Sequence, residues 1–227
     1  MFCERCKKVI IPDGTHFCYQ CSIERQQIPS IFKKPTVIEN KIFPNLDLKY
    51  LKGNSLEFNY ISDYYRKYHF GDININTQYN EFCESLEGLK NNISNDIQIF
   101  FSLLKNIFSS EEFIIITIPS HNPKNNNTGI KRLAKLLIEH NKNIIDGTDI
   151  LIRIKEINKH GQNRTLSEQY NSMILNKDIS LKNKIILLFD DIYTIGNTIN
   201  AAKKLIEKEN IKNIEKLTLA KTFYKNK

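Results

Sequence analysis

One short span of this sequence combines two carboxylates with a polar loop. It follows the apolar run 185–189 and contains Asp190, Asp191, Thr194, Ile195, Gly196, Asn197 and Thr198. In parallel α/β sheets, ligands bind just outside the carboxyl ends of the strands. The amides of a loop that enters a helix bind phosphate, and carboxylates accept hydrogen bonds from hydroxyl groups such as those of ribose. The span therefore predicts a sugar-phosphate site, and the alternative is an ordinary strand–turn–helix with an acidic end.

The same span differs from the nucleotide-binding P-loop, because no Gly-Lys-Ser/Thr follows the loop. A phosphorylated sugar with free hydroxyl groups fits the two acids and the loop better than a nucleotide triphosphate does.

Four cysteines near the N-terminus form two closely spaced pairs. They are Cys3, Cys6, Cys18 and Cys21. Two such thiolate pairs provide the tetrahedral sulfur set of a structural Zn²⁺ site. Disulfides and a redox Cys-x-x-Cys are the alternatives, and a reducing compartment and the duplication of the pair disfavour them. Four protein ligands leave no open position on the metal, so we expect the zinc to be structural.

Composition indicates one medium-sized domain with a small appendage. The chain has 227 residues, of which 41% are hydrophobic and 26% charged, and its formal net charge is +8. No apolar run is long enough to span a membrane and no signal-peptide region is seen, so we expect a cytoplasmic protein. The positive charge favours polyanions or phosphorylated substrates, although a lysine-rich composition alone would also produce it.

The elements that must position these residues alternate between strand and helix from residue 112 onward, which predicts a twisted, mostly parallel sheet flanked by helices. We expect strands at 113–118, 148–157 and 215–223 and one ending at the acid pair, with helices at 79–89, 93–108, 130–140, 168–175 and 197–208. The polar loops 119–129 and 158–167 then meet the acid pair at one carboxyl edge. The aromatic stretch 56–70 is expected in the core, with a base-stacking surface as the alternative.

We divide the chain into three regions. Residues 1–27 form the zinc module, 28–110 a connector and helical hood region, and 111–227 the α/β domain.

The acidic span resembles the ribose-phosphate motif of type I phosphoribosyltransferases, Asp-Asp-x-x-Thr-Thr-Gly-x-Thr, with Ile195 in place of the second Thr. Over nearly the whole chain, the order of features is similar to that of the ComF-type family, phosphoribosyltransferase-like proteins linked to competence and DNA utilisation. The further matching segments are the four-cysteine module, Lys67 to Asp72, Ile118-Pro119-Ser120-His121, Gly129, Gln162, Leu166-Ser167 and Thr218 to Lys221.

This resemblance implies a type I phosphoribosyltransferase-like fold that binds phosphoribosyl diphosphate together with Mg²⁺, and transfer of phosphoribose to a nitrogen acceptor. Asp190 and Asp191 would be the catalytic acids that hold the ribose hydroxyls, and the residues from Thr194 to Thr198 would bind the 5-phosphate. In this chain Thr128-Gly129-Ile130-Lys131-Arg132 stands where the family usually has Arg-Gly-Phe-Asn-Gln. The candidates for the pyrophosphate side are then Lys131, Arg153, Lys155 and Arg164.

Two other functions remain open from the sequence. One is a non-catalytic module that senses sugar phosphates or associates with single-stranded DNA or DNA-processing proteins, favoured by the basic balance and the altered loops. The other is a phosphoribosyltransferase-like effector of phage defence.

Overall fold

The computed structural model describes residues 58–66, 79–157, 165–176 and 178–223 with their side chains, and the backbone of short strands at 37–38, 46–47, 49–51, 69–70 and 73–74. All of these residues belong to the unit that runs from Ile31 to Lys227. The four cysteines of the predicted zinc module and Arg164 lie outside the described residues.

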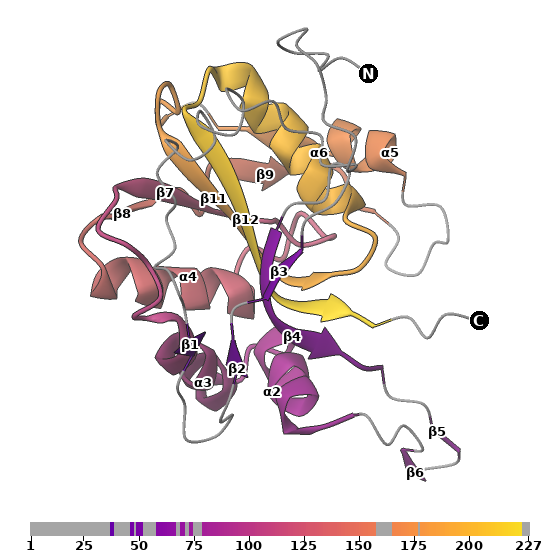
Figure 1. Ribbon diagram of the computed structural model, residues 1–227. Helices are drawn as coiled ribbons and strands as arrows, with labels where there is room; N and C mark the ends of the chain where they lie inside the picture. Colours follow the sequence, from indigo (N-terminus) through magenta and orange to yellow (C-terminus); the bar gives the residue numbers. More distant parts are fainter. Residues whose placement is uncertain are drawn as a thin grey trace, which may run out of the picture. The chain divides into compact units, whose positions relative to one another are not determined.

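A six-stranded sheet forms the centre of this unit (Figure 1). Its strands in spatial order are β3 (Lys49–Leu51), β4 (Phe58–Tyr64), β12 (Asn213–Thr222), β11 (Ile185–Tyr193), β7 (Phe113–Thr117) and β8 (Ile144–Asp146). All neighbouring pairs are parallel except β3 and β4, which are antiparallel. The acid pair therefore lies at the carboxyl end of a central strand.

Helices cover both faces of the sheet (Figure 1). On one face lie α2 (Glu81–Lys90), α3 (Ser94–Leu104) and α4 (Gly129–His140), and on the other lie α5 (Leu166–Asn171) and α6 (Asn197–Ile206), which continues into the 3₁₀ turn η1 (Glu207–Glu209). In β7, Phe113 and Ile115 pack into the first face while Ile114 and Ile116 pack into the second. A strand buried on both faces reads as a continuous apolar run, as β7 and the first half of β11 do.

Three antiparallel pairs lie outside this sheet. They are β1 (Val37–Ile38) with β2 (Leu46–Asp47), β5 (His69–Phe70) with β6 (Ile73–Asn74), and β9 (Leu151–Arg153) with β10 (Met173–Leu175). The β9–β10 pair brackets the second polar loop.

The predicted mostly parallel sheet with flanking helices is confirmed. Two expectations were wrong in detail. The predicted strand 148–157 is a turn followed by the short β9, while the edge strand of the sheet is β8 at 144–146. The predicted helix 168–175 ends at Asn171, and β10 follows it. Met173 to Leu175 leaves the helix because these residues pair with Arg153 to Leu151.

The strand β4 comes from the stretch that we assigned to the connector and hood, yet it pairs with β12 in the main sheet. Its apolar residues Phe58, Tyr60 and Ile61 are buried, which agrees with the expectation that the aromatic stretch is core.

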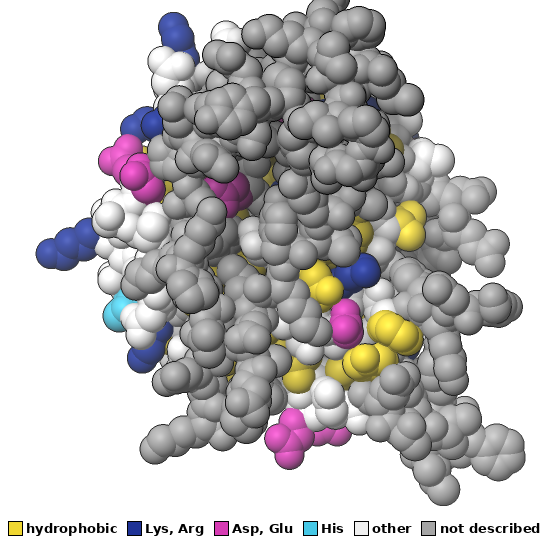
Figure 2. Space-filling view, viewed as in Figure 1, with side chains coloured by type: hydrophobic (Ala, Val, Ile, Leu, Met, Phe, Trp, Pro, Cys, Tyr) yellow, Lys and Arg dark blue, Asp and Glu magenta, His cyan; other side chains and the backbone are white. Residues whose placement is uncertain are grey.

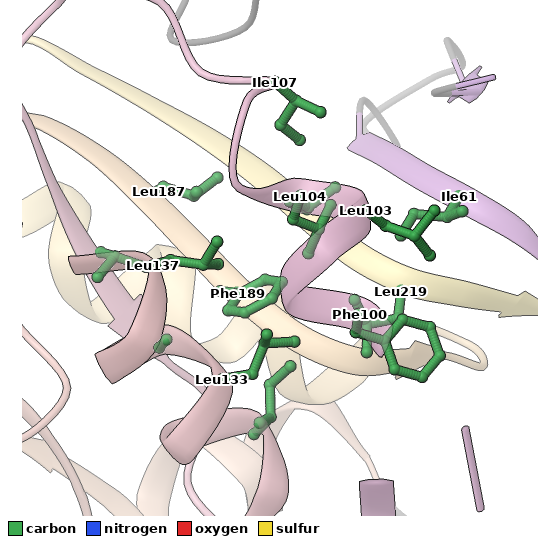
Figure 3. Packing of buried hydrophobic residues seen from close by; sticks show 14 of the residues in the cluster. Ile61, Phe100, Leu103, Leu104, Ile107, Leu133, Leu137, Leu187, Phe189 and Leu219 are labelled. Carbon is green, nitrogen blue, oxygen red and sulfur yellow. The ribbon is translucent and has the colours of Figure 1, made fainter. Parts of the chain in front are cut away.

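The larger hydrophobic cluster joins α2, α3 and α4 to the sheet (Figure 3). Figure 3 shows Phe100 and Leu104 of α3 together with Leu133 of α4, Phe189 of β11 and Leu219 of β12. Helix α2 joins this cluster through Phe82, Leu86 and Leu89, and its last residue, Lys90, forms an ion pair with Asp191 of β11.

We predict that Phe100→Ala lowers the free energy of unfolding by about 3–5 kcal/mol, because truncating a buried aromatic leaves a cavity in addition to the lost apolar burial. The matched control is Phe223→Ala, since Phe223 is 44% exposed, and it should cost less than about 1 kcal/mol. Urea unfolding of the two variants measures this difference. Equal losses would contradict the packing described here.

Candidate functional site

At the end of β11, the regular alternation of side chains between the two faces of the sheet is broken. Phe189 and Ile192 both pack into the cluster under α2 to α4, although residues three apart in a regular strand point to opposite faces. The interruption falls on the acid pair, where the carboxylates bond to the backbone. Asp190 Oδ1 accepts the N–H of Asp191 at 2.9 Å, and Asp191 Oδ1 accepts the N–H of Ile192 at 2.6 Å. The local fold thus holds both carboxylates at the strand end.

The two carboxylates have different environments. Burial, and after it the neighbouring Asp191 carboxylate, raises the pKa of Asp190 well above its usual value. The backbone N–H of Asp191 and the charge of Lys90 oppose this shift. Asp191 is near the surface and forms an ion pair with Lys90 of α2, with Nζ 3.4 Å from Oδ2. The pair therefore combines a carboxyl group that ionises with difficulty and one that is stabilised by a lysine.

The loop after β11 is shaped by Gly196. Its φ of 79° lies in the left-handed region, and a Cβ at this position would lie 2.1 Å from Oη of Tyr193. The Tyr193 ring stacks on Phe58, with ring centroids 4.0 Å apart. A side chain at position 196 would collide with the Tyr193 ring, so only glycine fits at this position.

Gly196 is also the N-cap of α6, and it has no side chain with which to cap the first-turn amides. Thr194, Asn197 and Thr198 surround this helix end as half-buried residues, while Ile195 is 59% exposed. The loop thus offers uncapped amides and hydroxyl groups beside the acid pair, which is the arrangement that binds an anion.

A cavity of about 280 Å³ lies beyond the end of β7. Its walls are the segment 117–120, loop residues 125, 126 and 128, Lys131 in the first turn of α4, residues 148, 149 and 151–153, and Asn176. Ile118 donates its N–H to Phe189 O at 3.0 Å, so this cavity lies one strand away from the acid pair. Lys131 and Arg153, two of the predicted pyrophosphate-side residues, both line it.

Both of these cations already have partners. Lys131 Nζ lies 2.5 Å from Asp149 Oδ1 at the cavity wall. Arg153 is buried and donates hydrogen bonds to backbone and side-chain oxygens. Arg132, next to Lys131, donates to Asn92 in the turn between α2 and α3 and to Ser94 at the start of α3. Lys155 is exposed after β9 and does not line the cavity.

A second cavity, of about 500 Å³, lies on the other side of the acid pair. It is lined by Tyr64, Arg66, Glu87, Lys90, Ile192, Thr194 and Thr222. Tyr64 donates its hydroxyl hydrogen bond to Glu87 at 3.1 Å. Burial and the Glu87 carboxylate raise the pKa of Tyr64 above its usual value, so the phenol remains a hydrogen-bond donor.

Sequence reasoning missed the contribution of α2. Glu87 and Lys90 stand three residues apart on the helix and so share a face, but no local pattern indicates that this face meets β11. Tyr64 and Arg66 belong to the aromatic stretch 56–70, which is expected in the core, and no local pattern places them at this cavity. The Lys90–Asp191 ion pair depends on tertiary packing between segments that lie far apart in the sequence.

Among the described residues, no group of three or more His, Cys, Asp or Glu side chains is arranged to hold a metal ion. No helix within the described ranges is long and apolar enough to cross a membrane.

On the face seen in Figure 2, the described Lys and Arg side chains are dispersed among acidic ones and do not gather in one patch.

No protein-family model matches the sequence, and no curated protein does. Solved structures of phosphoribosyltransferases do match. A hypoxanthine phosphoribosyltransferase from Staphylococcus aureus is 15% identical, with 61% of this chain and 64% of that one covered and a TM-score of 0.33. A hypoxanthine-guanine phosphoribosyltransferase from Bacillus anthracis is also 15% identical, with 64% and 71% covered and a TM-score of 0.34. With this degree of similarity, the function has to be argued from the residues of the site.

We predict that Asp190→Asn stabilises the protein at pH 8 and has little effect on stability near pH 4. A folded-state pKa above the unfolded value means that the folded protein binds more protons, so this group's contribution to stability falls as pH rises from the usual aspartate range toward the raised pKa. Asparagine keeps an oxygen that can accept the Asp191 N–H and removes the buried charge. Chemical unfolding of parent and variant across this pH range measures the effect, and a variant less stable than the parent at pH 8 would contradict it.

Proposed function

We propose that this chain binds the ribose 5-phosphate group of phosphoribosyl diphosphate or of a related sugar phosphate. The observation that carries the proposal is one continuous segment, in which the acid pair at the end of β11 is followed by Gly196 at the start of α6. The loop from Thr194 to Thr198 receives the 5-phosphate on its amides and hydroxyls. Asp190 and Asp191 accept hydrogen bonds from the ribose hydroxyls.

We propose phosphoribosyl transfer as the reaction, because two cavities at the carboxyl edge of the sheet border the acid pair. The cavity beyond β7 takes the diphosphate side and the cavity beside α2 takes the nitrogen acceptor. In such a transfer the bond from the anomeric carbon to pyrophosphate breaks, a bond to the acceptor nitrogen forms, and the acceptor loses a proton. Negative charge on the acid pair favours the positive charge that develops at the sugar.

Mg²⁺ belongs to this proposal as a cofactor that enters with the diphosphate. Such an ion would be held mainly by substrate oxygens and water. When bound, it would neutralise charge on the leaving pyrophosphate.

A second candidate is a protein that binds the sugar phosphate without turnover. It is favoured by the cavity beyond β7, where Lys131 is paired with Asp149 and the Arg153 guanidinium is held by neighbouring oxygens. Pyrophosphate release in the presence of phosphoribosyl diphosphate, Mg²⁺ and a panel of nitrogen acceptors separates the two candidates. Release by the parent and not by Asp191→Asn supports an enzyme.

Calorimetry tests the shared part of both candidates. We predict that the parent binds phosphoribosyl diphosphate and that Asp190→Asn weakens the affinity about tenfold or more, because an N–H donor replaces one of the carboxyl oxygens that accept from the ribose hydroxyls. Gly196→Ala should weaken it further, since a Cβ at that position collides with Tyr193.

The matched control is Ile195→Thr, at an exposed position of the same loop, which adds a hydroxyl and should bind at least as tightly as the parent. Unchanged affinity in both Asp190→Asn and Gly196→Ala would refute the assignment of the loop.

For the N-terminal cysteines we keep the proposal of a structural Zn²⁺ bound by Cys3, Cys6, Cys18 and Cys21. We predict about one tightly held zinc per chain, with chelation affecting mainly the first ~25 residues and leaving the sheet folded. Metal analysis of the purified protein and circular dichroism before and after chelation measure this. Protein free of zinc with reduced, unperturbed cysteines would contradict it.

A further inference from the structure

Arg153 is a deeply buried cation at the candidate site. It ends β9, and only 5% of the residue is exposed, although it borders the cavity beyond β7. A buried guanidinium is costly unless its donors are satisfied. Within the described part of the chain, its hydrogen bonds reach two separate segments next to the proposed site.

The first segment is the start of the loop after β7. Arg153 Nε donates to Ser120 O at 3.0 Å, and a terminal nitrogen donates to Pro119 O at 3.4 Å. A peptide unit is planar, so fixing its carbonyl also fixes the direction of the following N–H. These two bonds therefore set the orientation of the Ser120 and His121 amides. Ser120 lines the cavity, and His121 directly follows it in the chain.

The second segment is α5, which follows the second polar loop. The other terminal nitrogen of Arg153 donates to Gln169 Oε1 at 3.2 Å and to Ser172 Oγ in a short hydrogen bond. Gln169 and Ser172 are each only 1% exposed. Neither residue lines the cavity. They contact Arg153 on the side that faces away from the cavity, and so connect α5 to the cavity wall.

We propose that Arg153 is a positioning residue, which holds the amides of Ser120 and His121 in place for the diphosphate part of the ligand and ties their orientation to α5. This inference rests on the proposed function. In this view Arg153 positions the cavity wall and does not contact pyrophosphate itself. Gln169 would then affect diphosphate affinity although it does not line the cavity.

The decisive variant is Gln169→Leu, which removes an acceptor of Arg153 without altering a cavity-lining side chain. We expect it to weaken binding of phosphoribosyl diphosphate with Mg²⁺ about three- to tenfold, and Arg153→Lys about tenfold or more, because a lysine cannot bridge the same acceptors. Ribose 5-phosphate affinity should stay within about twofold of the parent in both, since its loop lies after β11. The matched control is Asn171→Leu, an exposed amide on the same helix.

Coupling gives a second readout. If Arg153 and Gln169 act as a unit, the double variant Arg153→Lys/Gln169→Leu should bind the diphosphate no more weakly than Arg153→Lys alone. Calorimetry of the four proteins and the control measures this. Unchanged diphosphate affinity in Gln169→Leu, with loss only in Arg153→Lys, would overturn the inference in favour of direct contact.

A measurement without ligand separates this inference from the proposed function. Hydrogen exchange at the Ser120 and His121 amides, followed by NMR, should be faster in Gln169→Leu than in the parent and unchanged in Asn171→Leu. A parent that binds neither ligand would refute the proposed function, and exchange would still test the coupling of Gln169 to the wall. Equal exchange in parent and Gln169→Leu would overturn the inference.

Discussion

A carboxylate pair held at the edge of a hydrophobic sheet is the constraint around which this structure is built. Asp190 stands at the end of a strand whose preceding residues are fully buried, and taking a charge out of water costs free energy unless other groups stabilise it. The structure supplies a backbone N–H to each carboxylate and a lysine to Asp191. A ligand with hydroxyl groups would complete the hydrogen bonding of this pair.

The elements around the acid pair hold the groups that border it in fixed positions. Helix α2 is packed on the core through its apolar face and so brings Lys90 to Asp191. The Tyr193–Phe58 stack supports the loop at Gly196 and fixes the start of α6. On the other side, Arg153 fixes the first turn after β7. The acid pair is thus bordered by two cavities whose walls are held by buried contacts.

Much of this was predictable from sequence because it is encoded locally. The apolar runs of β7 and β11, the periodicity of α2, α3 and α4, and the acid–loop–helix span each lie within one continuous stretch. The edge strand β8 and the strand β10 were missed because they are short and are defined by their partners. The burial of Arg153 and the place of Lys90 depend on contacts with distant segments. From sequence alone, an arginine in a strand next to a polar loop is equally consistent with a ligand-binding group.

The central claim is that the loop from Thr194 to Thr198 holds a sugar 5-phosphate while Asp190 and Asp191 hold its ribose. A crystal structure of the full chain with phosphoribosyl diphosphate and Mg²⁺ tests it most directly. The account predicts the 5-phosphate on the first-turn amides of α6, the ribose hydroxyls on the acid pair, and the diphosphate toward the cavity beyond β7. A ligand bound elsewhere, or a phosphate loop left empty at saturating ligand, would contradict it.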